Sequence, residues 1–428
     1  MQTPEKYVRY NIFANVTDAA FFGFGMGVSS FVTMIPLFIA SLTDSTILIG
    51  LVASLHMVGW QLPQIFMSSM VARRKRYLPM VLWTTIHERW PFIALGFLCI
   101  ALAGGVLGKA AALPLAFIFV LCHAFGGGIT ANAWQTMIGK IIPTRIRGTF
   151  YGIQSSAAAL MGSAGALLAG FLLATLPYPL NFAVCFFLTG IAMMVSLGFL
   201  AISHEDAHVI EAAEQPKGRA FWAHLRDIFM RDANFRWFIV ARSLSQLAQM
   251  VAAFYTIYAV RDFGLSLGTA GVLAGIQGLT QAIANPLVGR LGDIYGHRRT
   301  FALTNVLLAV SAFAAFSAQS PAWFYVIFAL AGMVNAQWTT SLAMLVEFGT
   351  EVERPYYIGL ANTAIAPATL LAPIIGGAIV DVFGFKTMFF VAIVIALICV
   401  WVTMVLLNDP HKRKPVSWSS AASAVAGD

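Results

Sequence analysis

The feature that most limits how this chain can fold is a nearly unbroken series of long apolar stretches. A helix needs about 20 apolar residues to cross the hydrocarbon core of a bilayer. Only 10% of the 428 residues are charged, whereas a soluble domain carries about 25%. We therefore expect an all-α integral membrane protein. Cutting the chain at charges, prolines and turn residues gives about twelve spans: 12–40, 46–70, 78–105, 112–141, 147–175, 180–202, 234–261, 267–291, 299–317, 322–348, 355–383 and 386–408.

The spans form two sets of six, separated by a polar stretch. This pattern predicts an N-terminal six-helix bundle (1–202), a linker (203–233), a C-terminal six-helix bundle (234–408) and a disordered tail (409–428). Apolar residues recur at helical spacing between Phe221 and Met230, which predicts an amphipathic helix along the membrane surface. The linker would connect the two bundles or, alternatively, dock a partner protein.

The basic residues indicate the orientation of the chain. Of the Lys and Arg residues in the loops between the predicted spans, only Lys109, Arg261 and Lys386 fall on one side of the membrane. The other loop Lys and Arg residues fall on the opposite side. The positive-inside rule then places both termini in the cytoplasm of a bacterial-type inner membrane. The net charge of +8 is spread over loops, so we expect no nucleic-acid partner. Residues 1–9 lack the apolar core of a removable signal peptide, and the four cysteines lack metal-ligand spacing.

Two loop patterns recur in both halves of the chain. Gly289–Arg299 follows Pro286, and the same distance after Pro63 places Lys75-Arg76 opposite Arg298-Arg299. The segment Arg147-Gly-Thr-Phe-Tyr-Gly opens span five, and Arg354-Pro-Tyr-Tyr-Ile-Gly opens span eleven with the same Arg-to-Gly spacing. Recurrence in the same order indicates an internal duplication, as in many carriers.

The pattern Gly-x-Leu-x-Asp-x-x-Gly-x-Arg-Arg at Gly289–Arg299 resembles the signature loop of the major facilitator superfamily. The segment Ala372–Gly377, followed by Asp381 and Gly384, resembles the eleventh helix of that family. The resemblance implies two pseudo-symmetric six-helix bundles, a monomer, and a cytoplasmic gating loop. The residues assigned to this loop are Gly289, Asp293, Gly296, Arg298, Arg299 and, facing them, Arg147.

The first-half copy of the loop departs from the family pattern. Met70 stands at the position of the Asp and Phe66 at the position of the first Gly, so the latch between the halves would be one-sided. In the second half we expect Asp293 to accept from free backbone donors at the start of span five, near Arg147 and Gly148, and to stabilise an outward-open state. The alternative is a solvated loop that only sets topology.

Polar side chains within spans are candidates for the substrate or proton pathway, because an ionised group in hydrocarbon costs ~2.5 to 3.5 kcal/mol. Glu88 and Arg89 are adjacent and point about 100 degrees apart, so each should have its own partner; a structural ion pair with a neighbouring helix is the alternative. The alternative for Arg242 is that its side chain snorkels to the membrane interface. The alternative for His123 is a hydrogen-bonding packing residue. The candidates are Asp18, Glu88, Arg89, His123, Gln135, Arg242, Gln246, Gln249, Asn335 and Glu347.

These features predict a secondary transporter that moves a small solute by alternating access, driven by protons and needing no cofactor. Many aromatic and Met residues and few charges favour efflux of an apolar or amphiphilic compound. One alternative is an uptake carrier for a small metabolite or sugar. Another is a transporter-like receptor or scaffold, in which Asp18 and Glu88 would be dispensable. No phosphate-binding loop and no nucleophile with an adjacent base is present, so we do not expect an enzyme.

Overall fold

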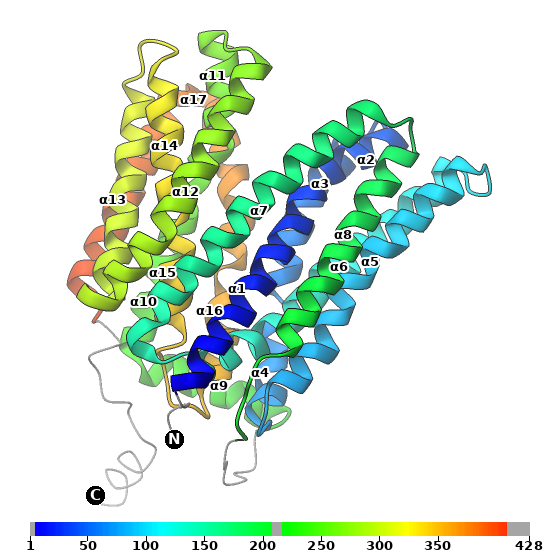
Figure 1. Ribbon diagram of the computed structural model, residues 1–428. Helices are drawn as coiled ribbons and strands as arrows, with labels where there is room; N and C mark the ends of the chain where they lie inside the picture. The colour runs from blue at the N-terminus through cyan, green and yellow to red at the C-terminus, as the bar shows by residue number, and fades with distance from the viewer. Residues whose placement is uncertain (1–4, 208–215, 409–428) are drawn as a thin grey trace, which may run out of the picture.

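A computed structural model describes residues 5–207 and 216–408, and these residues form helices joined by short connections (Figure 1). The predicted tail at 409–428 lies outside the described residues. The N half comprises α1 (Glu5–Val28), α2 (Met34–Leu42), α3 (Thr46–Gln61), α4 (Gln64–Ala72), α5 (Leu78–Ala103), α6 (Lys109–Ile141), η1 (Thr144–Ile146), α7 (Arg147–Thr175) and α8 (Leu180–Ala201).

The connecting helix α9 (Arg219–Arg231) leads into the second set of helices. The C half comprises α10 (Ala233–Ala248), η2 (Gln249–Ala253), α11 (Tyr255–Phe263), α12 (Leu267–Tyr295), α13 (His297–Phe316), α14 (Trp323–Asn335), α15 (Gln337–Leu345), α16 (Arg354–Ala364), α17 (Ala366–Trp401) and η3 (Val402–Leu406). The prediction of an all-α membrane fold built from two helical bundles is confirmed. The domain limits at 202, 233 and 408 stay a prediction.

Eight helical stretches of the described residues are long and apolar enough to cross a membrane. One of them, Arg354–Leu406, is 53 residues long and contains two of the expected spans. Gly384 divides it, because its φ of 81° is a backbone conformation that breaks a helix. Expected spans one, two, ten and eleven are each divided between two helices, and span seven into α10, η2 and α11. Helix α1 begins at Glu5, whereas the predicted start of span one is residue 12.

The first turn of α1, helix α9 and the end of the C half lie on one side of the molecule, which we call the linker side (Figure 1). On this side α7 packs between α1 and α12. Hydrogen bonds also join the halves here: Asn132 Nδ2 donates to Pro355 O at 2.8 Å and Asn362 Nδ2 donates to Gln64 Oε1 at 2.7 Å. On the opposite side the ends of the two halves lie farther apart (Figure 1).

Helix α9 is amphipathic, as its spacing predicts, and its position along the membrane surface stays a prediction. Phe221, Leu225 and Ile228 are buried, and they belong to the same hydrophobic cluster as Tyr356 of α16. Burying these three side chains against protein stabilises the contact, while Trp222 and Met230 of the same helix stay exposed. The helix therefore packs on the linker side of the bundle.

Candidate functional site

A cavity of about 260 Å³ lies mainly among the helices of the N half. Aromatic rings form much of its wall, so we call it the aromatic cavity. Trp60 and Trp338 come from opposite halves, and their ring centroids are 5.3 Å apart. The lining residues are Asp18, Ala19, Phe22, Trp60, Val81, Thr85, Glu88, Arg89, Gly127, Thr130, Ala131, Trp134, Gln154, Ser155, Ala158, Leu200, Trp338 and Leu342.

One wall of the aromatic cavity holds an ion pair between α1 and α5. Arg89 Nη2 lies 3.7 Å from Asp18 Oδ1, and Ser196 Oγ donates to the same carboxylate oxygen at 2.5 Å. Arg89 also donates to Met193 O at 2.6 Å and to Thr85 Oγ1 at 3.1 Å. Both charges are therefore compensated by protein groups, which matches the structural-ion-pair alternative for Arg89.

Glu88 has a different environment from its neighbour Arg89. Its carboxylate accepts a hydrogen bond from Thr85 Oγ1 at 3.2 Å, and among the described residues no cation lies within ion-pair distance of it. The side chain lines the aromatic cavity and is partly exposed to it. Of the two carboxyl groups, Glu88 is thus the one that a solute or proton could reach without breaking an ion pair.

His123 lies behind this wall and is not among the lining residues. Its Nδ1 is 2.7 Å from the backbone oxygen of Glu88, and a carbonyl oxygen only accepts, so Nδ1 carries the proton in this contact. The ring stacks on Phe31 at 5.1 Å and on His56 at 5.4 Å. These contacts match the packing alternative for His123.

A second cavity, also of about 260 Å³, lies mainly in the C half and adjoins the first at Trp338. Amide side chains dominate it, so we call it the amide cavity. The predicted polar stripe on span seven is among its walls, since α10 and the start of η2 present those residues on one face. The lining residues are Met57, Gln61, Arg242, Gln246, Gln249, Gln281, Val334, Asn335, Gln337, Trp338, Ser341 and Ile365.

The amides of this cavity are held in place by one another. Gln249 Nε2 donates to Gln246 Oε1 at 3.2 Å and to Gln337 Oε1 at 3.1 Å. Asn335 Nδ2 donates to Gln281 Oε1 at 3.0 Å. Such a network fixes the donors and acceptors before a ligand arrives, which lowers the entropy cost of binding.

Asn362 of α16 links the amide cavity to the N half. Its Oδ1 accepts from Arg242 Nη1 at 3.1 Å, while its Nδ2 donates to Gln64 Oε1 at 2.7 Å and to Gln135 Oε1 at 3.2 Å. Gln135 is fully buried at this contact and does not line either cavity. Sequence reasoning overlooked Asn362, because one uncharged polar residue in a membrane helix carries little signal.

The gating loop contacts the N half where the signature predicts. Asp293 Oδ1 accepts from the backbone N–H of Gly148 at 2.7 Å, and Oδ2 accepts from the N–H and the hydroxyl of Thr149, both at 2.6 Å. The two backbones touch: a methyl group on Gly289 would lie 2.1 Å from Gly148 O. A carboxylate here meets both the free donors and the positive end of the α7 dipole.

The remaining residues of the predicted loop have separate roles. Gly296 has a φ of 96°, which favours glycine. Arg298 Nη1 donates to Leu407 O at 2.8 Å, and Arg299 is exposed. Arg147 is buried and donates to Gly139 O at 2.7 Å, so it ties α7 to the end of α6. Arg299 alone fits the solvated-loop alternative.

Glu347 was expected in the substrate or proton pathway, but it does not line either cavity. His297 lies between two carboxylates, with its Nε2 at 3.5 Å from Glu347 Oε1 and 3.7 Å from Asp293 Oδ1. The structure thus places Glu347 beside the gating loop. Its position about two turns beyond the amide cavity could not be fixed from the sequence.

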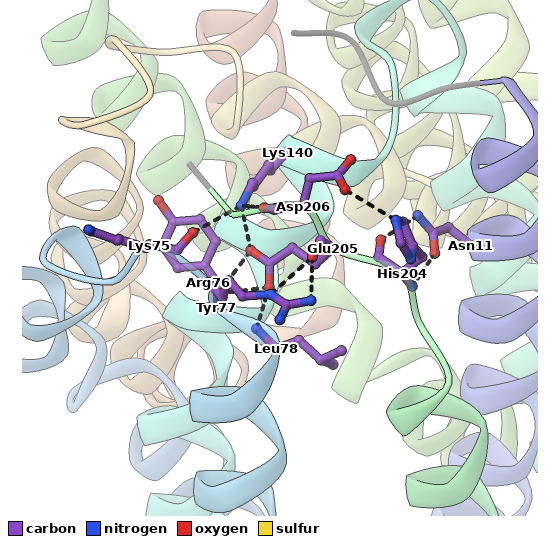
Figure 2. A network of polar contacts seen from close by, with 9 residues as sticks. All are labelled: Asn11, Lys75, Arg76, Tyr77, Leu78, Lys140, His204, Glu205 and Asp206. Atoms are coloured by element: carbon purple, nitrogen blue, oxygen red, sulfur yellow. Dashed lines mark hydrogen bonds and ion pairs between the residues drawn. The ribbon is translucent and has the colours of Figure 1, made fainter. Parts of the chain in front are cut away.

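A buried carboxylate that sequence reasoning missed holds the start of the linker (Figure 2). Glu205 accepts from the backbone N–H groups of Tyr77 and Leu78, at 2.8 and 2.7 Å to Oε2, and from Lys140 Nζ at 2.8 Å. Arg76 donates to the backbone oxygen of Glu205 at 2.8 Å. We call this group the Glu205 clasp. It caps α5 and joins it to α6.

Helix α9 touches the segment of α4 that lacks the family Asp. Phe66 of α4 is 62% exposed in total, and its ring packs edge-on against Trp222 with centroids 6.1 Å apart. Farther along, Arg231 Nη2 forms an ion pair with Glu353 at 2.7 Å. Helix α9 therefore contacts α4 of the N half and the start of α16 of the C half.

Comparison with known proteins agrees with this architecture. Residues 77–259 and 238–426 match the family model described as Major Facilitator Superfamily. Over 155 residues, 36% of this chain and 31% of the relative, the chain is 26% identical to mouse "Hippocampus abundant transcript 1 protein". Over 177 residues, 40% of this chain and 33% of the relative, it is 30% identical to the Streptomyces glaucescens "Tetracenomycin C resistance and export protein". The matched stretch thus spans about a third of each relative.

A solved structure shares nearly the whole fold. A bacterial homologue of the iron transporter ferroportin, in an outward-facing state, superposes with a TM-score of 0.74 over 92% of this chain and 98% of the other, at 15% identity. Three observations support one family: the two helical bundles, the contact of the signature loop with the start of α7, and the family match over both halves. The chain belongs to the major facilitator superfamily.

Proposed function

We propose that this protein is a secondary active transporter that exports an amphiphilic compound by alternating access. The observation that carries the proposal is the pair of cavities that adjoin at Trp338. An amphiphile has an apolar part for the aromatic cavity and a polar part for the amide cavity. Pockets that bind small molecules combine an apolar wall with a few placed polar groups in this way. Export is supported by the name of the tetracenomycin relative.

We assign the linker side to the cytoplasm and the opposite side to the exterior. The basic-residue asymmetry supports this orientation, and it puts both chain ends in the cytoplasm of an inner membrane. The contacts of Asp293 and Asn362 would then close the cytoplasmic side in an outward-facing state. Transport requires that these contacts break while the opposite ends approach, with the halves rocking about the cavities.

We assign proton coupling to Glu88 and a positioning role to the Asp18–Arg89 pair. Glu88 lines the aromatic cavity and accepts one hydrogen bond from Thr85. Protonating Asp18 would instead leave Arg89 with its charge uncompensated, which costs ~3 to 5 kcal/mol for a buried pair. A solute and a proton that compete for the Glu88 region would give exchange of one for the other.

Proton movement in proteoliposomes tests this assignment. With a pH-sensitive dye trapped inside, we expect addition of amphiphilic aromatic compounds to move protons through the wild type. Glu88→Gln should abolish this movement while binding persists, and Asp44→Asn, at an exposed carboxylate, should leave it unchanged. Movement that survives Glu88→Gln would remove the proton role. A sugar that binds and moves while no amphiphile does would indicate the uptake carrier instead.

A further inference from the structure

Arg242 is a buried cation whose charge is balanced by no carboxylate in the part of the chain that the structure describes. It is 4% exposed and lines the amide cavity. Its guanidinium donates to the neutral Oδ1 of Asn362 at 3.1 Å and lies 5.6 Å from the centroid of the Phe238 ring. Among the described residues it makes no ion pair. The snorkelling alternative does not fit, because the side chain reaches the cavity and not the membrane interface.

The contrast with Arg89 shows why this is unusual. Both arginines lie within spans and line a cavity, but Arg89 has a carboxylate, a carbonyl and hydroxyl groups around it. An arginine in the middle of a span costs ~2.5 to 3.5 kcal/mol or more on insertion scales, and such residues normally pair. The protein carries this cost at Arg242, which indicates that its counter-ion comes from outside the chain.

The other walls of the amide cavity suit an anion without supplying one. The described lining contains Gln61, Gln246, Gln249 and Gln337 and no Asp or Glu. Amide N–H groups donate to an oxyanion, and guanidinium presents two parallel N–H bonds to a carboxylate or sulfonate. A cation would meet the positive charge of Arg242 with no carboxylate to offset it, so this cavity discriminates against cationic head groups.

We propose that the amide cavity binds the single anionic head group of the transported amphiphile, with the oxyanion on Arg242 and the apolar body in the aromatic cavity beyond Trp338. The inference rests on the proposed function and names its substrate class.

Binding of matched ionic and neutral probes tests the proposal. Naphthalene-2-sulfonate and 2-naphthoate share their apolar body with naphthalene-2-sulfonamide and 2-naphthamide, and differ in charge. We would measure dissociation constants for all four with the full chain in lipid nanodiscs. The variants are Arg242→Gln, Arg242→Lys and, as a matched loss of one exposed positive charge, Arg290→Gln.

We expect at least tenfold tighter binding of each anion than of its amide to the wild type and to Arg290→Gln. Arg242→Gln should remove this preference, and Arg242→Lys should keep part of it, because an ammonium retains the charge but not the paired geometry. Equal affinity of anion and amide for the wild type would by itself overturn the proposal. A preference for the anion that survives Arg242→Gln would overturn it as well. Transport of a neutral amphiphile, with no preference for anions, would overturn this inference and leave the proposed function standing.

Discussion

Replacing Asp293 by Asn should open the linker side of the transporter. The carboxylate accepts three hydrogen bonds from Gly148 and Thr149, all between 2.6 and 2.7 Å. Asn has nearly the same shape but only one oxygen, so its NH₂ group must face at least one donor. The substitution also removes a negative charge from the N-terminus of α7.

The size of the effect follows from these two losses. An N–H left without its acceptor in a buried contact costs about 1 to 3 kcal/mol, and the loss of a carboxylate at a helix N-terminus costs about 0.3 to 1 kcal/mol, or up to ~2 when partly buried. Together they weaken the closed linker side by about 1.3 to 5 kcal/mol. At ~1.4 kcal/mol for each factor of ten, the closed-to-open ratio falls by ~10- to ~4000-fold.

Pulsed electron-electron distance measurements can detect this shift. Spin labels at Arg74 and Arg290, which are exposed in the two halves, would report their separation in a background without the four native cysteines. We expect one short distance in the parent protein and a second, longer distance in Asp293→Asn. Thr149→Val removes only the hydroxyl contact and should give an intermediate shift.

The control is Asp227→Asn, at a carboxylate on α9 that is 55% exposed. It removes the same charge from the linker side but breaks no contact between the halves, so the distances should not change. An Asp293→Asn distribution identical to that of the parent would refute the reasoning. Equal shifts from both variants would show that net charge on this side, and not the contact with α7, sets the equilibrium.

Two further predictions concern the linker. Glu205→Gln leaves the buried Lys140 ammonium without its carboxylate, so the free energy of unfolding should fall by about 3 to 5 kcal/mol. Thermal unfolding in detergent would measure this loss, and Lys140→Met should recover part of it in the Glu205→Gln background; unchanged stability would contradict the clasp. Trp222→Ala removes the aromatic contact with Phe66, worth about 0.5 to 1.5 kcal/mol, so the longer distance between the labels should increase in population while stability stays nearly constant. An unaltered distribution would show that α9 does not hold the halves together.

The sequence allowed the fold and one contact between the halves to be predicted. Length and polarity of the apolar stretches determine the number of crossings, because lipid permits few other backbone structures. The contact of Asp293 with Gly148 could be expected on physical grounds, because the carboxylate of the signature loop can accept from the free N–H donors at a helix N-terminus. Helical spacing alone also placed Arg242, Gln246 and Gln249 on one face.

The rest depends on depth along the helix axis and on partners distant in sequence. Asn335, Gln337 and Ser341 line the amide cavity. Glu347 follows a few residues later in the chain but lies beside the gating loop. Glu205 follows the last apolar residue of α8 and is surrounded by polar residues, so it looks like any solvated linker residue. Its burial results from partners at 77, 78 and 140, which no local pattern reveals.

The Glu205 clasp also has a consequence for how the protein is made. All partners of Glu205 lie within the first 206 residues. So does Asn11, which binds the backbone of the neighbouring His204 through both of its side-chain atoms. During translation, residues 203–206 can bind α1, α5 and α6 before most of the second bundle is synthesised. The N half can thus reach its native contacts during translation and present a finished surface against which the C half assembles.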